Sequence, residues 1–321
     1  MSYGVAVVGL GVIGRRMIEQ VARHGAFRIA SAWDASPAAR DAAARDFPGL
    51  PMAVDAGDAI ARPEVDVVYV GTPPRSHRAL VEQAARAGKA VFCEKPLAVS
   101  REDGEAMVEA VRAAGVAHAV NFPFASSESV RLLAQALARP GFGLAGVAVR
   151  MRFAAWPRDW QASAAWLAEA AEGGPTREVL SHWVYLLQRL FGEVELLASC
   201  VDAPVAGACE RASAAILRTG GVIATMSAQV GGAAPDEVVA EFHGAGRTLR
   251  LRDWHLLTEA GDASAAEAPI PGQPEDARQA VQQAQLTQLA ACLDGRAHAL
   301  ADLTAALRVQ RIVEAILHRP A

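Results

Sequence analysis

The chain is poor in cysteine, in clustered charge and in long apolar runs, and each shortage excludes a class of protein. Its four cysteines form no C-x-x-C pair, so we expect neither a disulfide framework nor a metal site. The 31 Lys and Arg residues are scattered among 35 Asp and Glu residues, which argues against a nucleic-acid partner. No apolar run reaches the about 20 residues of a membrane span, so we expect no membrane partner. The first residues enter a glycine motif without a basic leader, which predicts a cytoplasmic protein.

What the chain does have is apolar content and length. It is 52% hydrophobic over 321 residues, with a mean hydropathy of +0.16. A chain of this length can bury one large core or two ordinary ones, and two domains are the better expectation.

A glycine motif follows the first strand-like run. Residues 5–8 are apolar and β-branched, and a helical pattern continues to Arg23 after the motif. G-x-G-x-x-G between a strand and a helix is typical of dinucleotide binding, because the glycines allow a tight turn and a close approach to a pyrophosphate at the helix N-terminus. An ordinary tight turn is the alternative. The candidate cofactor-binding residues are Gly9, Gly11, Val12, Ile13 and Gly14.

An acid ends the second apolar run. Asp34 follows residues 27–33, at about the distance from the motif where a dinucleotide site places a ribose-binding acid. A carboxylate there would repel a 2′-phosphate, and residues 35–37 offer no arginine, so we expect NAD rather than NADP. The alternative is that Asp34 only caps the helix beginning near Pro37.

Strands and helices continue to alternate up to about residue 120. Apolar runs at 65–70, 90–93 and 117–120 are separated by helical patterns, one of which opens at Ser100 with Asp103 in capping-box spacing. This alternation predicts an α/β fold with a doubly wound parallel sheet, whose ligands bind at the carboxyl ends of the strands.

A lysine stands at the end of the run 90–93. In Phe92-Cys93-Glu94-Lys95-Pro96-Leu97 the proline stiffens the backbone directly after Lys95. Taken alone, the segment could be a strand end with a surface lysine and a turn-forming proline.

The pattern of apolar and polar residues changes after residue 122. Alternating apolar and polar residues at 144–153, 214–219, 222–229, 238–243 and 248–252 predict an α+β domain with an open, largely antiparallel sheet. One face of such a sheet would be covered by helices and the other by a second subunit, which predicts a homodimer or homotetramer.

Two candidate clusters lie in this second part. Glu178 and His182 are spaced i, i+4 on an expected helix, either as a chemical pair or as an ordinary surface pair. Arg158 and Trp160 lie in an aromatic-rich loop, either to bind a polyhydroxylated substrate or to pack.

Together these motifs resemble the Gfo/Idh/MocA family of NAD(P)-dependent oxidoreductases. The resemblance rests on the glycine motif, on Asp34, on Thr72-Pro73 followed by His77, and on Glu94-Lys95-Pro96. It implies dehydrogenation or reduction of a CH–OH group in a sugar, cyclitol or related polyol. It also implies cofactor contacts from Thr72, Pro73, His77, Glu94, Lys95 and Asn121.

The resemblance also implies roles and boundaries in the second part. His182 would transfer the proton, and Lys95 would hold the substrate oxygen; the reverse assignment of the proton remains open. Glu178 stands where the family has Asp, and Glu172 stands where it has a glycine, so the role of Glu178 is open. We expect a Rossmann domain over 1–121, a substrate-binding and dimerisation domain over 122–295, and a C-terminal helix over 296–321 that packs on the Rossmann domain. Other chemistry on the same scaffold, or a non-catalytic NAD sensor, are the alternatives.

Overall fold

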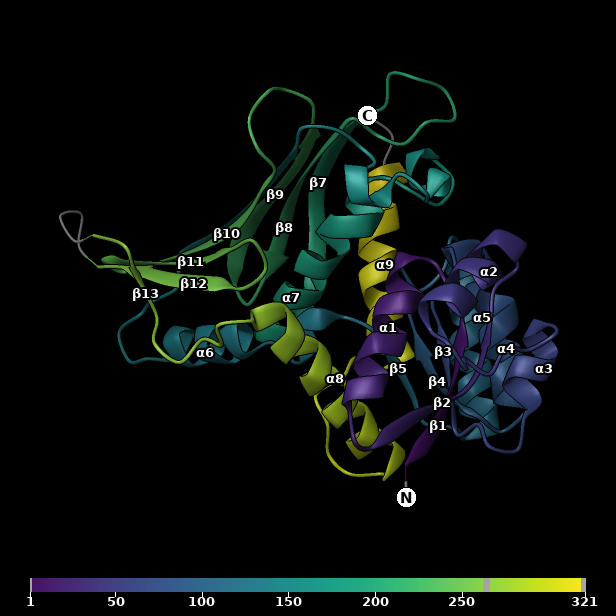
Figure 1. The fold of residues 1–321 in the computed structure, drawn as a ribbon. Coiled ribbons are helices and arrows are strands. Elements are labelled where there is room, and N and C mark those ends of the chain that lie inside the picture. The colour runs from purple at the N-terminus through teal and green to yellow at the C-terminus, as the bar shows by residue number, and fades with distance from the viewer. Residues whose placement is uncertain (1, 262–265, 319–321) are drawn as a thin grey trace. The chain divides into compact units, whose positions relative to one another are not determined.

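The computed structural model describes residues 2–261 and 266–318. These form two compact units (Figure 1). Unit 1 comprises residues 1–122 and 282–308, and unit 2 comprises residues 123–281 and 309–321. The later boundaries fall inside two helices, α8 (Ala277–Leu293) and α9 (Leu303–His318). The predicted three-part domain division stays a prediction.

Unit 1 is built on a parallel five-stranded sheet with the order β2-β1-β3-β4-β5. Its central strands are apolar on both faces, as expected for a sheet covered by helices on two sides. Helices lie around this sheet in Figure 1. The strands are β1 (Tyr3–Val8), β2 (Phe27–Trp33), β3 (Val67–Val70), β4 (Ala90–Cys93) and β5 (His118–Val120). The connecting helices are α1 (Val12–Arg23), α2 (Pro37–Asp46), α3 (Ala56–Ala61), η1 (Pro74–Ser76), α4 (His77–Arg86) and α5 (Arg101–Ala114).

Side-chain caps fix where several helices begin. Ser100 accepts the N–H of Asp103 at 3.0 Å, which confirms the predicted start of α5. At the other end, Gly115 closes α5 in the left-handed conformation. Ser36 accepts the N–H of Ala39 at 3.3 Å and caps α2.

Unit 2 is built on an eight-stranded sheet with the order β13-β12-β11-β10-β6-β9-β8-β7. All of its pairs are antiparallel except β6 with β9. Figure 1 shows α6 and α7 along one side of this sheet. The strands are β6 (Gly146–Phe153), β7 (Val194–Asp202), β8 (Ala212–Thr219), β9 (Val222–Val230), β10 (Glu237–Gly244), β11 (Arg247–Arg252), β12 (Leu256–Ala260) and β13 (Ala268–Pro269). The helices are η2 (Pro123–Ala125), α6 (Glu128–Leu137), η3 (Asp159–Gln161), η4 (Ala165–Ala168), η5 (Thr176–Leu180) and α7 (Ser181–Phe191).

The two faces of this sheet differ in polarity. One face is buried, and includes Val147, Met226 and Phe242. The opposite face carries a cross-strand row that register pairing places on one side: Arg250, Glu241, Ala148, Thr225, Ile216 and Ala198. At the β10–β12 end this row is charged, and its charges are paired within the chain.

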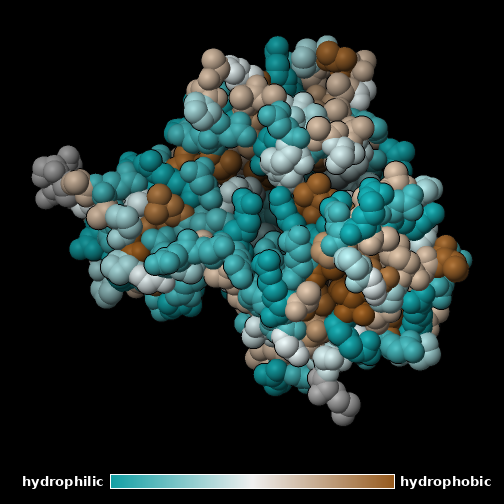
Figure 2. Space-filling view, viewed as in Figure 1, coloured by the Kyte–Doolittle hydropathy of each residue, from teal (hydrophilic) through white to brown (hydrophobic). Residues whose placement is uncertain are grey.

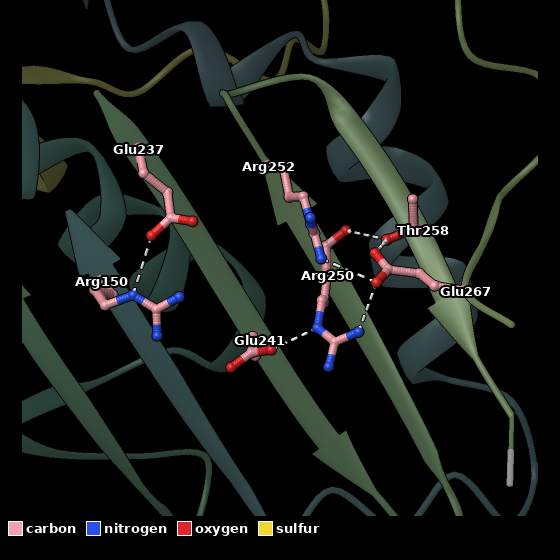
Figure 3. Close-up of polar contacts among 7 residues, drawn as sticks. All are labelled: Arg150, Glu237, Glu241, Arg250, Arg252, Thr258 and Glu267. Atoms are coloured by element: carbon pink, nitrogen blue, oxygen red, sulfur yellow. Dashed lines mark hydrogen bonds and ion pairs between the residues drawn. The ribbon is translucent and has the colours of Figure 1, made fainter. Parts of the chain in front are cut away.

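Figure 3 shows these ion pairs. Arg250 contacts Glu241 at 2.5 Å and Glu267 at 2.7 Å, and Arg252 contacts Glu267 at 2.9 Å. Arg150 pairs with Glu237 at 3.2 Å. Cross-strand pairs of opposite charge stabilise an exposed sheet face, so this end needs no further partner. The apolar members of the row lie towards β8 and β9, where Ile216 and Ile223 are 43% and 42% exposed.

The fold class predicted from the sequence is confirmed. A parallel Rossmann sheet is followed by a mostly antiparallel sheet with helices on one side. In Figure 2 the hydrophobic side chains of the face in view are separated by hydrophilic ones. None of the helices in the described ranges is both long and apolar enough to cross a bilayer.

Candidate active site

Backbone hydrogen bonds bring the first residues after the strands of unit 1 to one edge of the sheet. Each of these residues donates its N–H to the last residue of a neighbouring strand. The bonds run from Gly9 to Trp33 (2.8 Å), Gly71 to Val8 (2.8 Å), Glu94 to Val70 (2.9 Å) and Asn121 to Cys93 (2.8 Å). The glycine motif and the Glu94-Lys95-Pro96 segment therefore leave the sheet at the same edge, which is where parallel sheets bind ligands.

The three motif glycines meet three different requirements. Gly9 has a φ of +102°, and a Cβ there would lie 2.5 Å from the Gly71 carbonyl. A Cβ on Gly14 would lie 1.8 Å from the carbonyl oxygen of Gly9, so α1 can pack on β1 only with glycine at this position. A Cβ on Gly11 would meet nothing within 4 Å.

Gly11 is thus not required by the packing of the chain itself. It is the N-cap of α1 and supplies no side chain to cap it. Val12 is 36% exposed beside it, and Ile13 is partly exposed. Open space at a helix N-terminus with uncapped amides is what a bound pyrophosphate needs, so these residues fit a dinucleotide.

Asp34 holds the glycine loop. Its Oδ2 accepts the N–H of Leu10 at 2.7 Å, and its Oδ1 accepts the N–H of Ser36 at 2.8 Å. Because Ser36 caps α2, the alternative in which Asp34 only caps that helix is wrong. Each carboxylate oxygen keeps a second lone pair that can accept a ribose hydroxyl.

An arginine that the local sequence pattern does not predict lies beside this acid. Nη1 of Arg40, from the first turns of α2, donates to the carbonyl oxygen of Asp34 at 2.6 Å. The turns of α2 bring the Arg40 side chain back to Asp34, six positions earlier in the chain. Arg40 therefore lies outside residues 35–37, where the sequence offers no arginine.

Glu94 is held by two neutral donors. The hydroxyl of Tyr69 and Nδ2 of Asn121 both donate to its Oε1, at 2.6 and 2.5 Å. Gln285 in α8 donates in turn to Oδ1 of Asn121. Burial, together with the Glu94 carboxylate, raises the pKa of Tyr69 well above its usual range, so this hydroxyl keeps its proton and donates. The carboxylate next to Lys95 therefore has a fixed position.

Tyr69 and Gln285 are two residues of this network that the sequence motifs do not predict. A signal for Tyr69 was available, since it is the only residue of the Val67–Val70 strand with a polar tip. Gln285 carried no comparable signal, because it lies 164 residues from Asn121.

His77 ties two loops together. Its Nε2 lies 2.8 Å from the Thr72 carbonyl oxygen, and its Nδ1 lies 3.1 Å from that of Leu97. Burial lowers the pKa of His77, which favours the neutral ring. A neutral ring has one N–H, and the Cys93 thiol lies 3.5 Å from Nδ1, so the arrangement that satisfies most groups has Nε2 donating to Thr72 and the thiol donating to Nδ1.

This geometry fixes the turn before Pro73 against the turn after Lys95. The His77 side chain is completely buried. The contact of His77 with the cofactor stays a prediction. Its described contacts are with the carbonyl oxygens of Thr72 and Leu97, so it supports these two loops.

In unit 2, Glu178 and His182 do not share one regular helix. Glu178 lies in η5, a π-helical turn in which the N–H of Ser181 donates to the carbonyl of Thr176, and His182 lies in the first turn of α7. The extra residue in the π turn means that Glu178 and His182 are not stacked on one face as they would be in a regular α-helix, which is what the sequence predicts. Such turns are frequent at functional sites.

Buried carboxyl and guanidinium groups support the start of this turn. Glu210 accepts the N–H of Thr176 at 2.7 Å, and a Cβ on Gly174 would lie 2.2 Å from its carboxylate. Arg177 forms two hydrogen bonds with Glu314 of α9, at 2.7 and 2.8 Å. Burial raises the pKa of Glu210.

His182 lies against aromatic rings. The indole of Trp254 is perpendicular to the imidazole with ring centroids 4.9 Å apart, and Phe124 lies at 6.4 Å. Trp254 and its neighbour Asp253 have φ values of +74° and +47°, in the turn between β11 and β12. Left-handed backbone in a bulky residue is rare and marks a position that the surrounding packing enforces. Trp254 was not predicted to belong to the site.

Arg158 is surrounded by aromatic side chains. Its guanidinium lies 4.8 Å from the ring centroid of Trp160, 5.3 Å from that of Phe153 and 5.5 Å from that of Trp156. Its Nε donates to Oε1 of Gln161 at 2.9 Å. Burial lowers the pKa of Arg158, with Glu178 and Asp236 acting in the opposite direction. The guanidinium is therefore a half-buried cation held in one orientation.

Comparison with known proteins agrees with this geometry. Residues 3–122 match the Gfo/Idh/MocA family model, described as an oxidoreductase family with an NAD-binding Rossmann fold. Inositol 2-dehydrogenase from Rhizobium meliloti is 35% identical over 111 residues, which cover 35% of this chain and 33% of that protein. D-Apiose dehydrogenase from Paraburkholderia graminis is 28% identical over 279 residues, or 83% of this chain and 72% of that protein. The alignments with the inositol dehydrogenases thus span about a third of the length of those relatives.

Solved structures share the fold of the whole chain. A levoglucosan dehydrogenase, solved with NADH and levoglucosan, matches 99% of this chain with a TM-score of 0.84 at 19% identity, and 96% of that chain is covered. A dehydrogenase from Bordetella pertussis matches 98% of this chain with a TM-score of 0.83 at 23% identity, covering 94% of its own. The segment 3–122, which carries the glycine motif and Glu94-Lys95-Pro96, is thus similar to the family that the motifs resemble.

Proposed function

We propose, from the membership of residues 3–122 in the Gfo/Idh/MocA oxidoreductase family, that this protein is an NAD-dependent dehydrogenase or reductase. Its substrate would be a sugar, a cyclitol or a related polyol, oxidised at a CH–OH carbon or reduced at the corresponding carbonyl. The named relatives support this class of substrate, since they include inositol, apiose and anhydrofructose enzymes.

One observation carries the proposal. Glu94, whose carboxylate is fixed by Tyr69 and Asn121, directly precedes Lys95 at the sheet edge that also bears the glycine motif and Asp34. A cation on a rigid turn at this edge is suited to hold a substrate oxygen beside a bound dinucleotide.

The chain would hold NAD through its glycine loop and Asp34. The amides at the start of α1 would receive the pyrophosphate, and the open space at Gly11 leaves room for it. Asp34 would accept a ribose hydroxyl and disfavour the 2′-phosphate of NADP. When bound, NAD supplies the acceptor and donor of a hydride.

The protein's part in the reaction is to place the substrate oxygen and to move one proton. The ammonium group of Lys95 would donate a charge-assisted hydrogen bond to that oxygen, which favours the alkoxide that forms during oxidation. The His182 imidazole has ring nitrogens that can accept a proton, so this side chain would take the hydroxyl proton. Glu178 would accept a substrate hydroxyl or orient His182.

Two other functions remain as alternatives. Imine or enone reduction, or redox-assisted cleavage, would use the same residues without net oxidation of an alcohol. A sensor would bind NAD and turn over nothing.

We further propose that the protein is a homo-oligomer of the cytoplasm, where NAD is available. The face of the unit 2 sheet with Ile216 and Ile223 supports this, because these two β-branched residues are 43% and 42% exposed. Ile216→Lys should then shift the mass measured by light scattering to that of a monomer. An unchanged mass would refute this contact.

The function is tested by following nicotinamide absorbance with NAD and with NADP. The panel should contain aldoses, cyclitols, sugar acids and simple ketones, with Lys95→Ala as the comparison. Turnover that prefers NAD and disappears in Lys95→Ala supports the proposal. Binding of NAD without turnover of any compound would instead favour the sensor, and tightly retained NAD without net consumption would favour redox-assisted cleavage.

A further inference from the structure

We propose that Arg158 is an anion-binding residue and that the substrate carries a carboxylate or phosphate group in addition to its hydroxyls. The inference rests on the proposed function, because only an enzyme of that kind makes the bound anion a substrate. The Arg158 guanidinium lies among three aromatic rings and donates to one amide oxygen, and within the described residues Nη1 and Nη2 form no hydrogen bond.

The position of the guanidinium is set before any ligand arrives. Phe153, Trp156 and Trp160 surround it with centroids between 4.8 and 5.5 Å from its carbon. The Trp156 indole is itself fixed, since its Nε1 donates to the Leu167 carbonyl at 2.9 Å. Cation–π attraction holds a guanidinium among the rings, but the rings do not offer the oxygen lone pairs that its N–H groups bind best.

The one hydrogen bond of the side chain leaves a defined edge open. Gln161 takes the Nε proton at 2.9 Å and also lies 3.3 Å from the backbone nitrogen of Arg158, so it locks the stem of the side chain. The remaining donors are on Nη1 and Nη2. Two parallel N–H groups on these atoms match the two oxygens of a carboxylate or of a phosphate.

Two neighbouring acids favour the charged form of Arg158. Glu178, from η5, and Asp236, which precedes β10, both act electrostatically against the lowering of its pKa by burial. Asp236 also accepts the N–H of Ala154 at 2.9 Å. A half-buried cation gains from an anionic partner that fits the open edge of its guanidinium.

The experiment measures equilibrium binding to the NAD-saturated protein with matched sugar pairs. D-Glucuronate is compared with D-glucose, D-galacturonate with D-galactose, and D-glucose 6-phosphate with D-glucose, by calorimetry and by tryptophan fluorescence. A charge-assisted pair of hydrogen bonds should make the better anionic member bind about 10- to 100-fold more tightly than its neutral partner. The acid and phosphate arms identify which anion the site prefers.

Arg158→Met and Arg158→Lys identify the residue responsible. Methionine keeps an apolar stem among the rings and removes the charge, so the ratio between the affinities for the anionic and the neutral sugar should fall to about one. Lysine keeps the charge and loses the parallel donors, so the preference should fall without disappearing. Arg150→Met, on the exposed face of the sheet, is the control and should change nothing.

Three results would overturn the inference. These are equal or weaker binding of every anionic member in the wild type, a preference that persists in Arg158→Met, or an equal loss in Arg150→Met. Turnover of the same compounds separates this inference from the proposed function. Neutral polyols oxidised without any anion preference would refute the inference alone, whereas anion binding without turnover would refute the dehydrogenase and leave the anion site standing.

Discussion

The hydroxyl of Tyr69 donates a 2.6 Å hydrogen bond to Oε1 of Glu94, the residue directly before Lys95. Both residues lie at the carboxyl end of the unit 1 sheet, Tyr69 within β3 and Glu94 just after β4. A buried tyrosine thus fixes the carboxylate of the residue next to Lys95, at the edge of the sheet where the proposed cofactor would bind. This makes Tyr69 a positioning residue for the segment on which the proposed chemistry depends.

Tyr69→Phe should weaken NAD binding by about 10-fold, because a hydrogen bond to a charged group contributes about 1.5 kcal/mol or more. Calorimetric titration with NAD measures the change. Tyr3→Phe is the matched control in the same unit, since the Tyr3 hydroxyl bonds the exposed Asp294. Equal affinities for wild type and Tyr69→Phe would contradict the role given to this hydroxyl.

Substitution of two glycines of the motif should change two different properties, stability at Gly14 and NAD affinity at Gly11. Gly14→Ala places a Cβ 1.8 Å from the Gly9 carbonyl oxygen and should lower the free energy of unfolding by about 1–3 kcal/mol. Gly11→Ala meets nothing within 4 Å, so its unfolding free energy should change by less than about 1 kcal/mol while NAD binding weakens at least about 10-fold. Urea denaturation and NAD titration of both variants give the two numbers. Unimpaired NAD binding by Gly11→Ala would show that the pyrophosphate does not lie there.

Trp254→Ala should lower kcat about 10- to 100-fold with a smaller effect on KM, because His182 loses the ring that fixes its orientation. Asp253→Gly is the control. It relieves left-handed backbone in the same turn and keeps the indole, so it should raise stability by up to about 1 kcal/mol and leave kcat unchanged. Loss of kcat in both variants would mean that the turn matters and the ring contact does not.

Glu210 should give stability a particular pH dependence. Burial raises its folded-state pKa above the ordinary value of 4.5, with Arg177 acting in the opposite direction. The folded protein therefore holds this proton more tightly than the unfolded chain, and the stabilisation is complete below about pH 4.5 and lost as pH rises through the folded-state pKa. The unfolding free energy of wild type minus that of Glu210→Gln should fall as pH rises from 4.5, in urea denaturation at a series of pH values. A difference that is flat or rises with pH would contradict this.

Much of unit 1 could be predicted from the sequence because its determinants are local. The glycine motif, the acid after β2 and the cap at Ser100 each lie within a few residues of the structure they specify. The parallel alternation follows from the same local patterns. The alternation of strands and helices alone predicts that Glu94 and Asn121 lie at the same edge of the sheet.

The rest could not be predicted because it depends on contacts between distant segments. Gln285 reaches Asn121 from 164 residues away, and Trp254 reaches His182 only once β11 and β12 have paired. The parallel pairing of β6 with β9 inside an otherwise antiparallel sheet also has no local signal. The π turn at Glu178 is not visible in the apolar pattern of the sequence, because the segment still reads as a helix. It changes only which residues lie on the same side of that helix.

The most direct measurement of the central claim is transfer of label from the nicotinamide. NADH carrying deuterium at both C4 positions is incubated with the carbonyl form of the best substrate, and the product is analysed by mass spectrometry for wild type and Lys95→Met. The account predicts one deuterium in the product for each NADH oxidised, with a rate at least about 100-fold lower in Lys95→Met. Bound NADH that delivers no deuterium to any product, or undiminished transfer in Lys95→Met, would contradict it.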